Sequence, residues 1–258
     1  MFKGARLLLT MALYVIAFIS CGEKNRQQSL YVKVERFPNG NIKEGLIKVG
    51  NDSIDFKGER FYPSGAIQSQ FSMKNGLMHG YTKDYYPNGK VFLEGLYVAG
   101  RKKGYFRYYD STEHLEKVIY FINYRDSSVA RPNEIIRFNR QGDTLYEESY
   151  FYEFFRKADT LTSISDGYKF KFVSKGRIFP YSYLILCNFD EKYNFLGSNK
   201  CIPLLMKGNI IELSRTNNKS GINFLRGYIL NTQSPLSSDG KYTGKSVEMY
   251  FSIPYYVR

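Results

Sequence analysis

The sequence predicts an all-β protein: an N-terminal array of stacked β-hairpins followed by a C-terminal antiparallel β-sandwich. Aromatic residues make up 17% of the chain, with 24 Tyr, 20 Phe and no Trp, and aromatic side chains favour strands. A turn motif recurs three times in the N-terminal half, and apolar residues alternate with lysines in the C-terminal half. At 258 residues the chain is long enough for two domains.

The chain begins with the features of an export signal. Lys3 and Arg6 precede an uncharged apolar run over residues 7–19, and small residues follow that run. The run is shorter than the roughly 20 residues that a transmembrane helix needs. We therefore expect a signal peptide over residues 1–20 and no permanent transmembrane helix at this position.

A cysteine follows directly after Ser20. The stretch FISCG resembles the lipobox of bacterial lipoproteins, with Phe18 where that family prefers leucine. The resemblance implies cleavage before Cys21, lipidation of the Cys21 thiol and a tether over residues 21–30. It also implies a place in the cell envelope, lipid-anchored at the outer membrane and either facing the periplasm or exposed on the surface. The alternative is an ordinary signal peptide with an incidental cysteine.

The stretches RFPNGNIKEG, RFYPSGAIQSQ and DYYPNGKVFLEG share one pattern. In each, an aromatic residue, a proline and a small polar residue precede a glycine. Proline presets φ for the first corner of a tight turn, and glycine adopts a positive φ without steric cost. Each copy therefore predicts a β-hairpin turn, with its glycine at Gly40, Gly65 or Gly89.

A second pattern has the same period. NGLMHGYTKDYYPNG aligns with AGRKKGYFRYYDST after a shift of 24 residues, which pairs Gly76 with Gly100 and Gly80 with Gly104. A single hairpin is marginally stable in water, so we expect successive hairpins to stack into an elongated sheet. The fold itself, and not a ligand, is expected to require these glycines.

Together the two patterns resemble the MORN-type repeat in its bacterial variant, over roughly residues 31–125. The resemblance implies a non-catalytic scaffold that promotes oligomerisation or contacts membranes, and some bacterial relatives are labelled antitoxin components. The turn motif is lost in YYDSTEHLEK, and residues 137–151 form a degenerate unit that closes the array. The predicted repeat domain therefore spans residues 31–155.

The pattern changes over residues 156–258. Tyr168, Phe170 and Phe172 alternate with lysines, which is typical of a strand with one buried face. YSYLILCNF is apolar on both faces and predicts a central strand. Five to seven short strands in this segment favour an antiparallel β-sandwich. The alternative is a continuation of the N-terminal sheet.

The charge of the chain is strongly positive and unevenly distributed. The net charge is +13, and residues 156–258 carry 15 basic and 7 acidic side chains. Such a surface suits anionic lipid headgroups, an acidic polysaccharide or an acidic protein. Nucleic acid is not expected, because the chain carries an export signal and has no Lys/Arg block or zinc-ligand spacing.

Two further cysteines, Cys187 and Cys201, lie in the C-terminal half. Export permits disulfides, and neighbouring strands would bring the two thiols together. A free, buried Cys187 in an apolar strand is the alternative, and the sequence alone slightly favours it.

Motifs for catalysis are absent from the sequence. The two histidines, His79 and His114, lack zinc-ligand spacing, and neither a nucleophile elbow nor a phosphate-binding loop is present. The carboxylate pairs at 147–148 and 190–191 are expected at solvated edges or turns, because adjacent strand residues point to opposite faces. We therefore expect no enzyme, metal or cofactor. The remaining alternatives are an immunity-type partner of a toxin and a hydrolase acting on the cell envelope.

Overall fold

The computed structural model describes residues 31–50, 55–125, 127–156, 160–161, 168–197, 201–215 and 220–257. In these residues the protein is all-β with antiparallel sheets, apart from the short parallel pair β12 and β18 and one 3-10 turn. The chain divides into two compact units, the first ending at Val91 and the second beginning at Phe92. The expected all-β class is confirmed.

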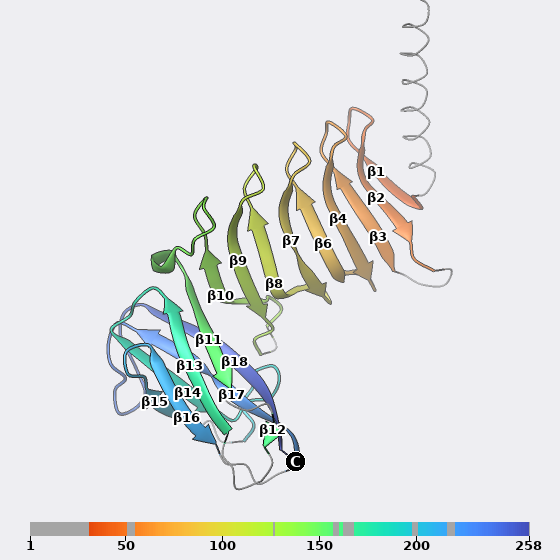
Figure 1. Cartoon of the computed structure of the whole chain (residues 1–258). Helices are drawn as coiled ribbons and strands as arrows, with labels where there is room; N and C mark the ends of the chain where they lie inside the picture. Colours follow the sequence, from red (N-terminus) through yellow and green to blue (C-terminus); the bar gives the residue numbers. More distant parts are fainter. Residues whose placement is uncertain are drawn as a thin grey trace, which may run out of the picture. The chain divides into compact units, whose positions relative to one another are not determined.

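The first unit contains a ladder of antiparallel strands in the order β1-β2-β3-β4-β6, with β5 paired to β4. One face is packed around Leu46 and Phe71, which are 5% and 3% exposed. Gly58 lies directly opposite Phe71, and a Cβ at Gly58 would lie 2.3 Å from the Phe71 ring. Only glycine leaves room for this ring. The strands, in orange and yellow in Figure 1, are β1 (Lys33–Arg36), β2 (Ile42–Lys48), β3 (Phe56–Phe61), β4 (Ile67–Lys74), β5 (Leu77–Met78) and β6 (Gly80–Tyr85).

The three motif turns share one backbone geometry. At the third, the amide of Gly89 donates to Tyr86 O at 2.9 Å, and the amide of Tyr86 donates to Lys90 O at 2.8 Å. Gly89 has a φ of 81°, so the turn is a type I turn followed by a left-handed residue. The same two bonds recur at residues 37–41 and 62–66, and also at 110–114, 139–143, 190–194 and 237–241.

The second unit contains two sheets. In the first sheet the strand order is β7-β8-β9-β10-β11-β13-β16, and in the second it is β12-β18-β17-β14-β15. A 3-10 turn, η1 (Tyr146–Glu148), precedes β11. The strands of the first sheet are β7 (Val91–Val98), β8 (Arg101–Tyr109), β9 (Leu115–Ile122), β10 (Arg131–Arg137), β11 (Tyr150–Arg156), β13 (Tyr168–Gly176) and β16 (Ile210–Arg215). Those of the second are β12 (Thr160–Leu161), β14 (Tyr181–Cys187), β15 (Cys201–Leu205), β17 (Gly221–Thr232) and β18 (Ser246–Val257).

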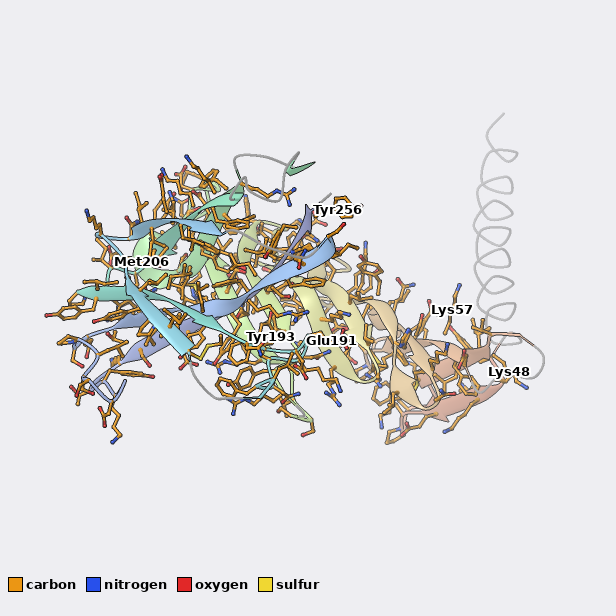
Figure 2. All side chains as sticks on the ribbon, turned by 90° about the horizontal axis from the view of Figure 1, so that it is seen from below. Lys48, Lys57, Glu191, Tyr193, Met206 and Tyr256 are labelled. Atoms are coloured by element: carbon orange, nitrogen blue, oxygen red, sulfur yellow. A yellow bond between two sulfur atoms is a disulfide. The ribbon has the colours of Figure 1, made fainter. Side chains whose placement is uncertain are left out.

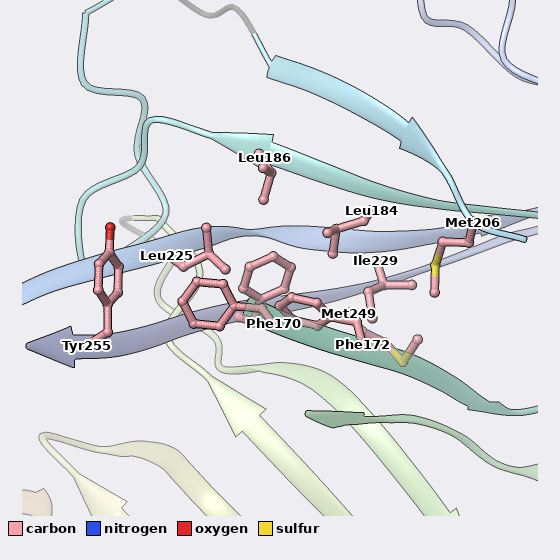
Figure 3. Close-up of a cluster of buried hydrophobic side chains, with 10 residues drawn as sticks. Phe170, Phe172, Leu184, Leu186, Met206, Leu225, Ile229, Met249 and Tyr255 are labelled. Carbon is pink, nitrogen blue, oxygen red and sulfur yellow. The ribbon is translucent and has the colours of Figure 1, made fainter. Parts of the chain in front are cut away.

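The largest core of the second unit receives side chains from both sheets (Figure 3). Phe170 and Phe172 of β13 meet Leu184 of β14, Ile229 of β17 and Phe251 of β18, and all five are at most 1% exposed. The ring centroids of Phe172 and Phe251 are 4.8 Å apart. Burying large apolar side chains in this way stabilises each by about 1.5–3 kcal/mol. The alternation predicted for residues 168–172 therefore places Phe170 and Phe172 inward and the intervening lysines outward.

Strand β10 is joined to β18 by a side chain. Asn133 is fully buried; its Nδ2 donates to Tyr250 O at 2.9 Å, and its Oδ1 accepts from Tyr250 N at 2.6 Å. The asparagine amide thus takes the place of a neighbouring strand for the backbone N–H and C=O of Tyr250. Asn133 lies at a bulge in the pairing of β10 with β9, which gives the side chain its separate direction.

The expected domain boundary at residues 155 and 156 falls within the second compact unit, which begins at Phe92. Residues 150–156 form β11, which pairs with β13 along its whole length, from Tyr150 with Gly176 to Arg156 with Phe170. The loss of sequence periodicity after β11 therefore does not mark a break in the sheet, because strands of unrelated sequence still pair through their backbones. Strands β13 and β16 therefore continue the sheet that contains β11, as the alternative reading of the C-terminal segment predicted.

Candidate functional site

All seven glycines singled out from the repeats adopt left-handed backbone conformations. Their φ values lie between 74° and 101°, where a side chain is disfavoured. At Gly89 an added Cβ would have no neighbour within 4 Å, so the backbone angle alone explains the glycine. Five of them, Gly40, Gly65, Gly76, Gly89 and Gly100, lie in turns between strands. Gly80 begins β6, and Gly104 lies within β8, where the pairing with β7 is irregular.

In the turn that lacks the Pro-Asn-Gly motif, a carboxylate maintains the geometry. Asp110 Oδ1 accepts from the amides of Thr112 and His114 at 2.7 and 3.0 Å, and also from Thr112 Oγ1 at 2.6 Å. The hydroxyl of Thr112 and these amides lower the pKa of Asp110 to about 2. His114 Nδ1 lies 2.7 Å from Thr112 Oγ1. His114 thus lies in the turn of residues 110–114, held by Asp110 and Thr112.

Cys187 and Cys201 are directly opposite each other on β14 and β15 and form a disulfide. Their Cα atoms are 4.5 Å apart, the spacing of a cross-strand pair without backbone hydrogen bonds. The preference for a free Cys187 is therefore corrected, because strand register places the two thiols side by side. Cys21, the expected lipidation site, lies outside the described residues.

The carboxylate pairs singled out from the sequence lie in turns. Among the described residues, no group of three His, Cys, Asp or Glu side chains has metal-binding geometry. Asp190 Oδ1 caps its own turn by accepting from the amides of Lys192 and Asn194. Glu147 and Glu148 lie in the 3-10 turn η1. None of the helices in the described part of the chain is long and apolar enough to cross a membrane.

The outward face of β11, β13 and β16 is basic. Lys171 of β13 lies between Phe155 of β11 and Glu212 of β16 in the strand register. Its Nζ is 3.6 Å from Glu212 Oε1. Lys175, further along β13, lies 3.4 Å from Glu153. These ion pairs are solvent-exposed, so each contributes little to stability, and the lysines remain accessible to a charged ligand.

A groove of about 510 Å³ lies on this face. Phe155, which is 50% exposed, provides an aromatic surface, and Arg156 Nη1 donates to Pro254 O at 3.2 Å. Three cationic groups and one carboxylate line the groove, so its local charge is positive. We name it the basic groove; its lining is Phe155, Arg156, Lys169, Phe170, Lys171, Glu212 and Leu213.

No family model, curated protein or solved structure matches the chain. The chemistry of the chain's own surfaces is therefore the basis for its proposed function.

A polar and aromatic cluster in the second unit has no signal in the sequence. Arg131 Nη2 lies 3.0 Å from Glu248 Oε2, and the Tyr250 hydroxyl donates to the same Glu248 oxygen at 3.0 Å. The Arg131 guanidinium is 4.9 Å from the centroid of the Tyr124 ring and 5.1 Å from that of Tyr250. Arg131 and Glu248 are 117 residues apart in the chain, so no local pattern predicts their pairing.

Aromatic residues divide between core and surface. The stretch at residues 105–110 contains both kinds: Tyr105 is 54% exposed and Phe106 is fully buried. Near the C-terminus Tyr255 is buried, whereas Tyr256 is 46% exposed and is labelled in Figure 2. Exposed aromatics in both places are therefore available for contacts with a partner.

Proposed function

We propose that this protein is a non-catalytic, exported bacterial lipoprotein whose hairpin array is a MORN-like scaffold. The scaffold presents a basic C-terminal β-sandwich to an acidic component of the cell envelope, either a glycan or the surface of a partner protein. The turn geometry repeated along the array supports the scaffold role. The core shared by two sheets supports the sandwich.

The basic groove is the observation that carries this proposal. Lys169 and Lys171 project from β13 on the face opposite to the buried Phe170 and Phe172. Regular strand spacing thus forms a row of cations beside the exposed Phe155. Cations attract acidic groups, and an aromatic side chain adds apolar contact area for a sugar ring or a side chain.

Salt elution from an immobilised acidic polysaccharide tests the proposal. Heparin is the probe, and neutral dextran is the reference matrix. We expect the chain without residues 1–21 to bind heparin and not dextran. The double variant with Lys169→Gln and Lys171→Gln should elute from heparin at clearly lower salt than the parent chain, because it loses charge contacts that salt screens. The matched control, Lys207→Gln with Lys241→Gln, removes the same charge outside the groove and should elute later than the groove variant. Equal elution of the two variants would contradict a specific role of the groove.

The anchor is tested separately. Cys21→Ala should move the protein from the membrane fraction to the soluble fraction, because a lipidated cysteine is the proposed attachment. Cys187→Ala, which leaves Cys21 in place, is the control and should remain in the membrane fraction. If Cys21→Ala also remained there, the lipoprotein proposal would be wrong.

A further inference from the structure

Three side chains form a row across neighbouring strands of the second unit. Tyr105 of β8 is directly opposite Tyr120 of β9, and Tyr120 is directly opposite Glu134 of β10. The ring centroids of the two tyrosines are 4.8 Å apart. Tyr105 is 54% exposed, whereas Tyr120 and Glu134 are partly buried. The row therefore runs from solvent at Tyr105 to a sheltered carboxyl group at Glu134.

Two more tyrosines surround the carboxyl group. Burial raises the pKa of Glu134, and the nearby amide of Tyr152, on β11, and the nearby Asn133 side chain lower it in part. Tyr193, in the hairpin of residues 189–195, has a hydroxyl whose pKa is raised to about 12, mainly by burial and also by the charges of Tyr120 and Glu134. Tyr193 is labelled in Figure 2. We call the five side chains the tyrosine–glutamate row: Tyr105, Tyr120, Glu134, Tyr152 and Tyr193.

The carboxyl group of Glu134 has no cationic partner in the described part of the chain. The arginines nearby in the fold have other partners. Arg131 pairs with Glu248 at 3.0 Å, and Arg226 donates to Phe189 O at 2.8 Å and to Ser252 Oγ at 3.0 Å. Burial accordingly raises the pKa of Glu134 to about 7, against the two hydrogen bonds that lower it.

A sheltered carboxylate without a cation is unfavourable, and two hydrogen bonds satisfy only part of its acceptor capacity. A cation brought by a ligand would offset this cost. The tyrosine rings would add to the attraction, because the faces of aromatic rings attract cations. The same unit already uses this chemistry, since Arg131 lies over the rings of Tyr124 and Tyr250.

We propose that the tyrosine–glutamate row binds an organic ammonium group, such as the terminal amine of a ligand or of a partner's lysine. Tyr105 and Tyr120 contact the alkyl chain and the charge, and Glu134 pairs with the ammonium. The proposal does not depend on the basic groove, which carries the opposite charge. An anion is disfavoured at the row, because the only charge there is that of Glu134.

A pair of probes with the same shape tests the proposal on the whole mature chain. n-Butylammonium carries the charge, and n-butanol does not. At pH 8, where Glu134 is ionised, we expect n-butylammonium to shift the tyrosine ring signals of Tyr105 and Tyr120 in a saturable NMR titration. We expect n-butanol to bind at least tenfold more weakly. Equal binding of the two probes would overturn the proposal.

Variants locate the site. Glu134→Gln keeps the shape and removes the charge, so we expect at least tenfold weaker binding of n-butylammonium. Glu212→Gln, in the basic groove, is the control and should bind as the parent does. Tyr105→Leu removes an exposed ring and should weaken binding severalfold without unfolding the chain. Unchanged binding in both Glu134→Gln and Tyr105→Leu would overturn the proposal, as would stronger saturation of the same tyrosine signals by methyl β-glucoside than by n-butylammonium.

Discussion

At single positions in the repeats, the backbone angle decides the residue type. Gly89 has a φ of 81° and open space where a Cβ would lie. Gly58 is the opposite case, because a Cβ there would collide with the Phe71 ring. Glycine is therefore required for two different reasons, conformation in the turn and close packing in the strand.

Gly89→Val should destabilise the first unit by about 1–2 kcal/mol, because a left-handed conformation costs an L-residue that much, and a β-branched residue suits it least. Gly89→Asn is the matched control, since asparagine tolerates this conformation, and it should lose less. Urea unfolding followed by circular dichroism gives both values. Equal stability of Gly89→Val and the parent protein would contradict the turn geometry.

Glu134 should make the stability of the second unit depend on pH. Its pKa is about 7 in the folded protein and 4.5 in a solvated glutamate, so the folded state holds the proton more tightly. The resulting stabilisation is fully present below about pH 4.5 and is lost as the pH rises through about 7. Tyr105, Tyr120 and Tyr152 around it stay neutral in this range, because burial raises the pKa of each.

The measurement is the free energy of unfolding of the parent minus that of Glu134→Gln between pH 4.5 and 8. We expect this difference to fall by about 2 kcal/mol across the range. Glu212→Gln, whose carboxylate is exposed, should give a nearly flat difference. A difference for Glu134→Gln that rises with pH would show that the Glu134 charge is stabilised in the folded state.

At the scale of elements, hairpins with one recurring turn geometry build much of the molecule. Where the Pro-Asn-Gly sequence is absent, the first residue of the turn accepts hydrogen bonds from backbone amides within that turn. These residues are Asp110, Asn139, Asp190 and Ser237. Side-chain capping of this kind mimics a backbone turn. Sequence divergence in these turns therefore leaves the strand connections unchanged.

The disulfide fastens an edge strand. β15 is hydrogen-bonded only to β14 among the described strands, and Cys187–Cys201 closes a loop with a separation of 14 residues. Constraining a loop of this length stabilises a protein by about 3 kcal/mol. Reduction should therefore lower the urea midpoint of the parent chain. It should leave unchanged the urea midpoint of the double variant with Cys187→Ala and Cys201→Ala. If reduction changed neither protein, the crosslink would not contribute to stability.

At the scale of the whole molecule, the change in sequence pattern near residue 155 and the division of the structure do not coincide. β11 pairs with β13 over seven residues, and its Tyr152 and Phe154 pack against the core around Phe172. Strand β11 and the C-terminal strands that follow it therefore stabilise each other.

A protease recognition site placed at residues 162–167 tests this mutual dependence. After complete cleavage, the two fragments should separate on a denaturing gel and still elute together in size exclusion under native conditions, because backbone pairing and aromatic packing join them. The same recognition site at residues 51–54, between β2 and β3, is the matched control within the first unit. Elution of the two fragments as separate species after cleavage at 162–167 would support independent domains divided near residue 155.

The sequence alone determined the features that depend on neighbouring residues. The spacing of aromatic residue, proline and glycine predicts turns because the proline ring presets its own φ and glycine adopts a positive φ without steric cost, and Gly40, Gly65 and Gly89 have the predicted positive φ. Alternation predicts that Phe170 and Phe172 are buried and that Lys169 and Lys171 project outward, because strand geometry has a period of two. The same alternation places Lys169 and Lys171 of the basic groove on the outward face of β13.

Only the tertiary structure decided the features that depend on distant residues. Strand register brings Cys187 to Cys201, Tyr120 to Glu134 and Asn133 to Tyr250. Outside a hairpin motif, a pattern of local sequence does not show which strands become neighbours, since the backbone hydrogen bonds that pair strands are the same for nearly all residue types. For that reason the sequence did not predict the unpaired carboxyl group of Glu134 or the pairing of β11 with β13.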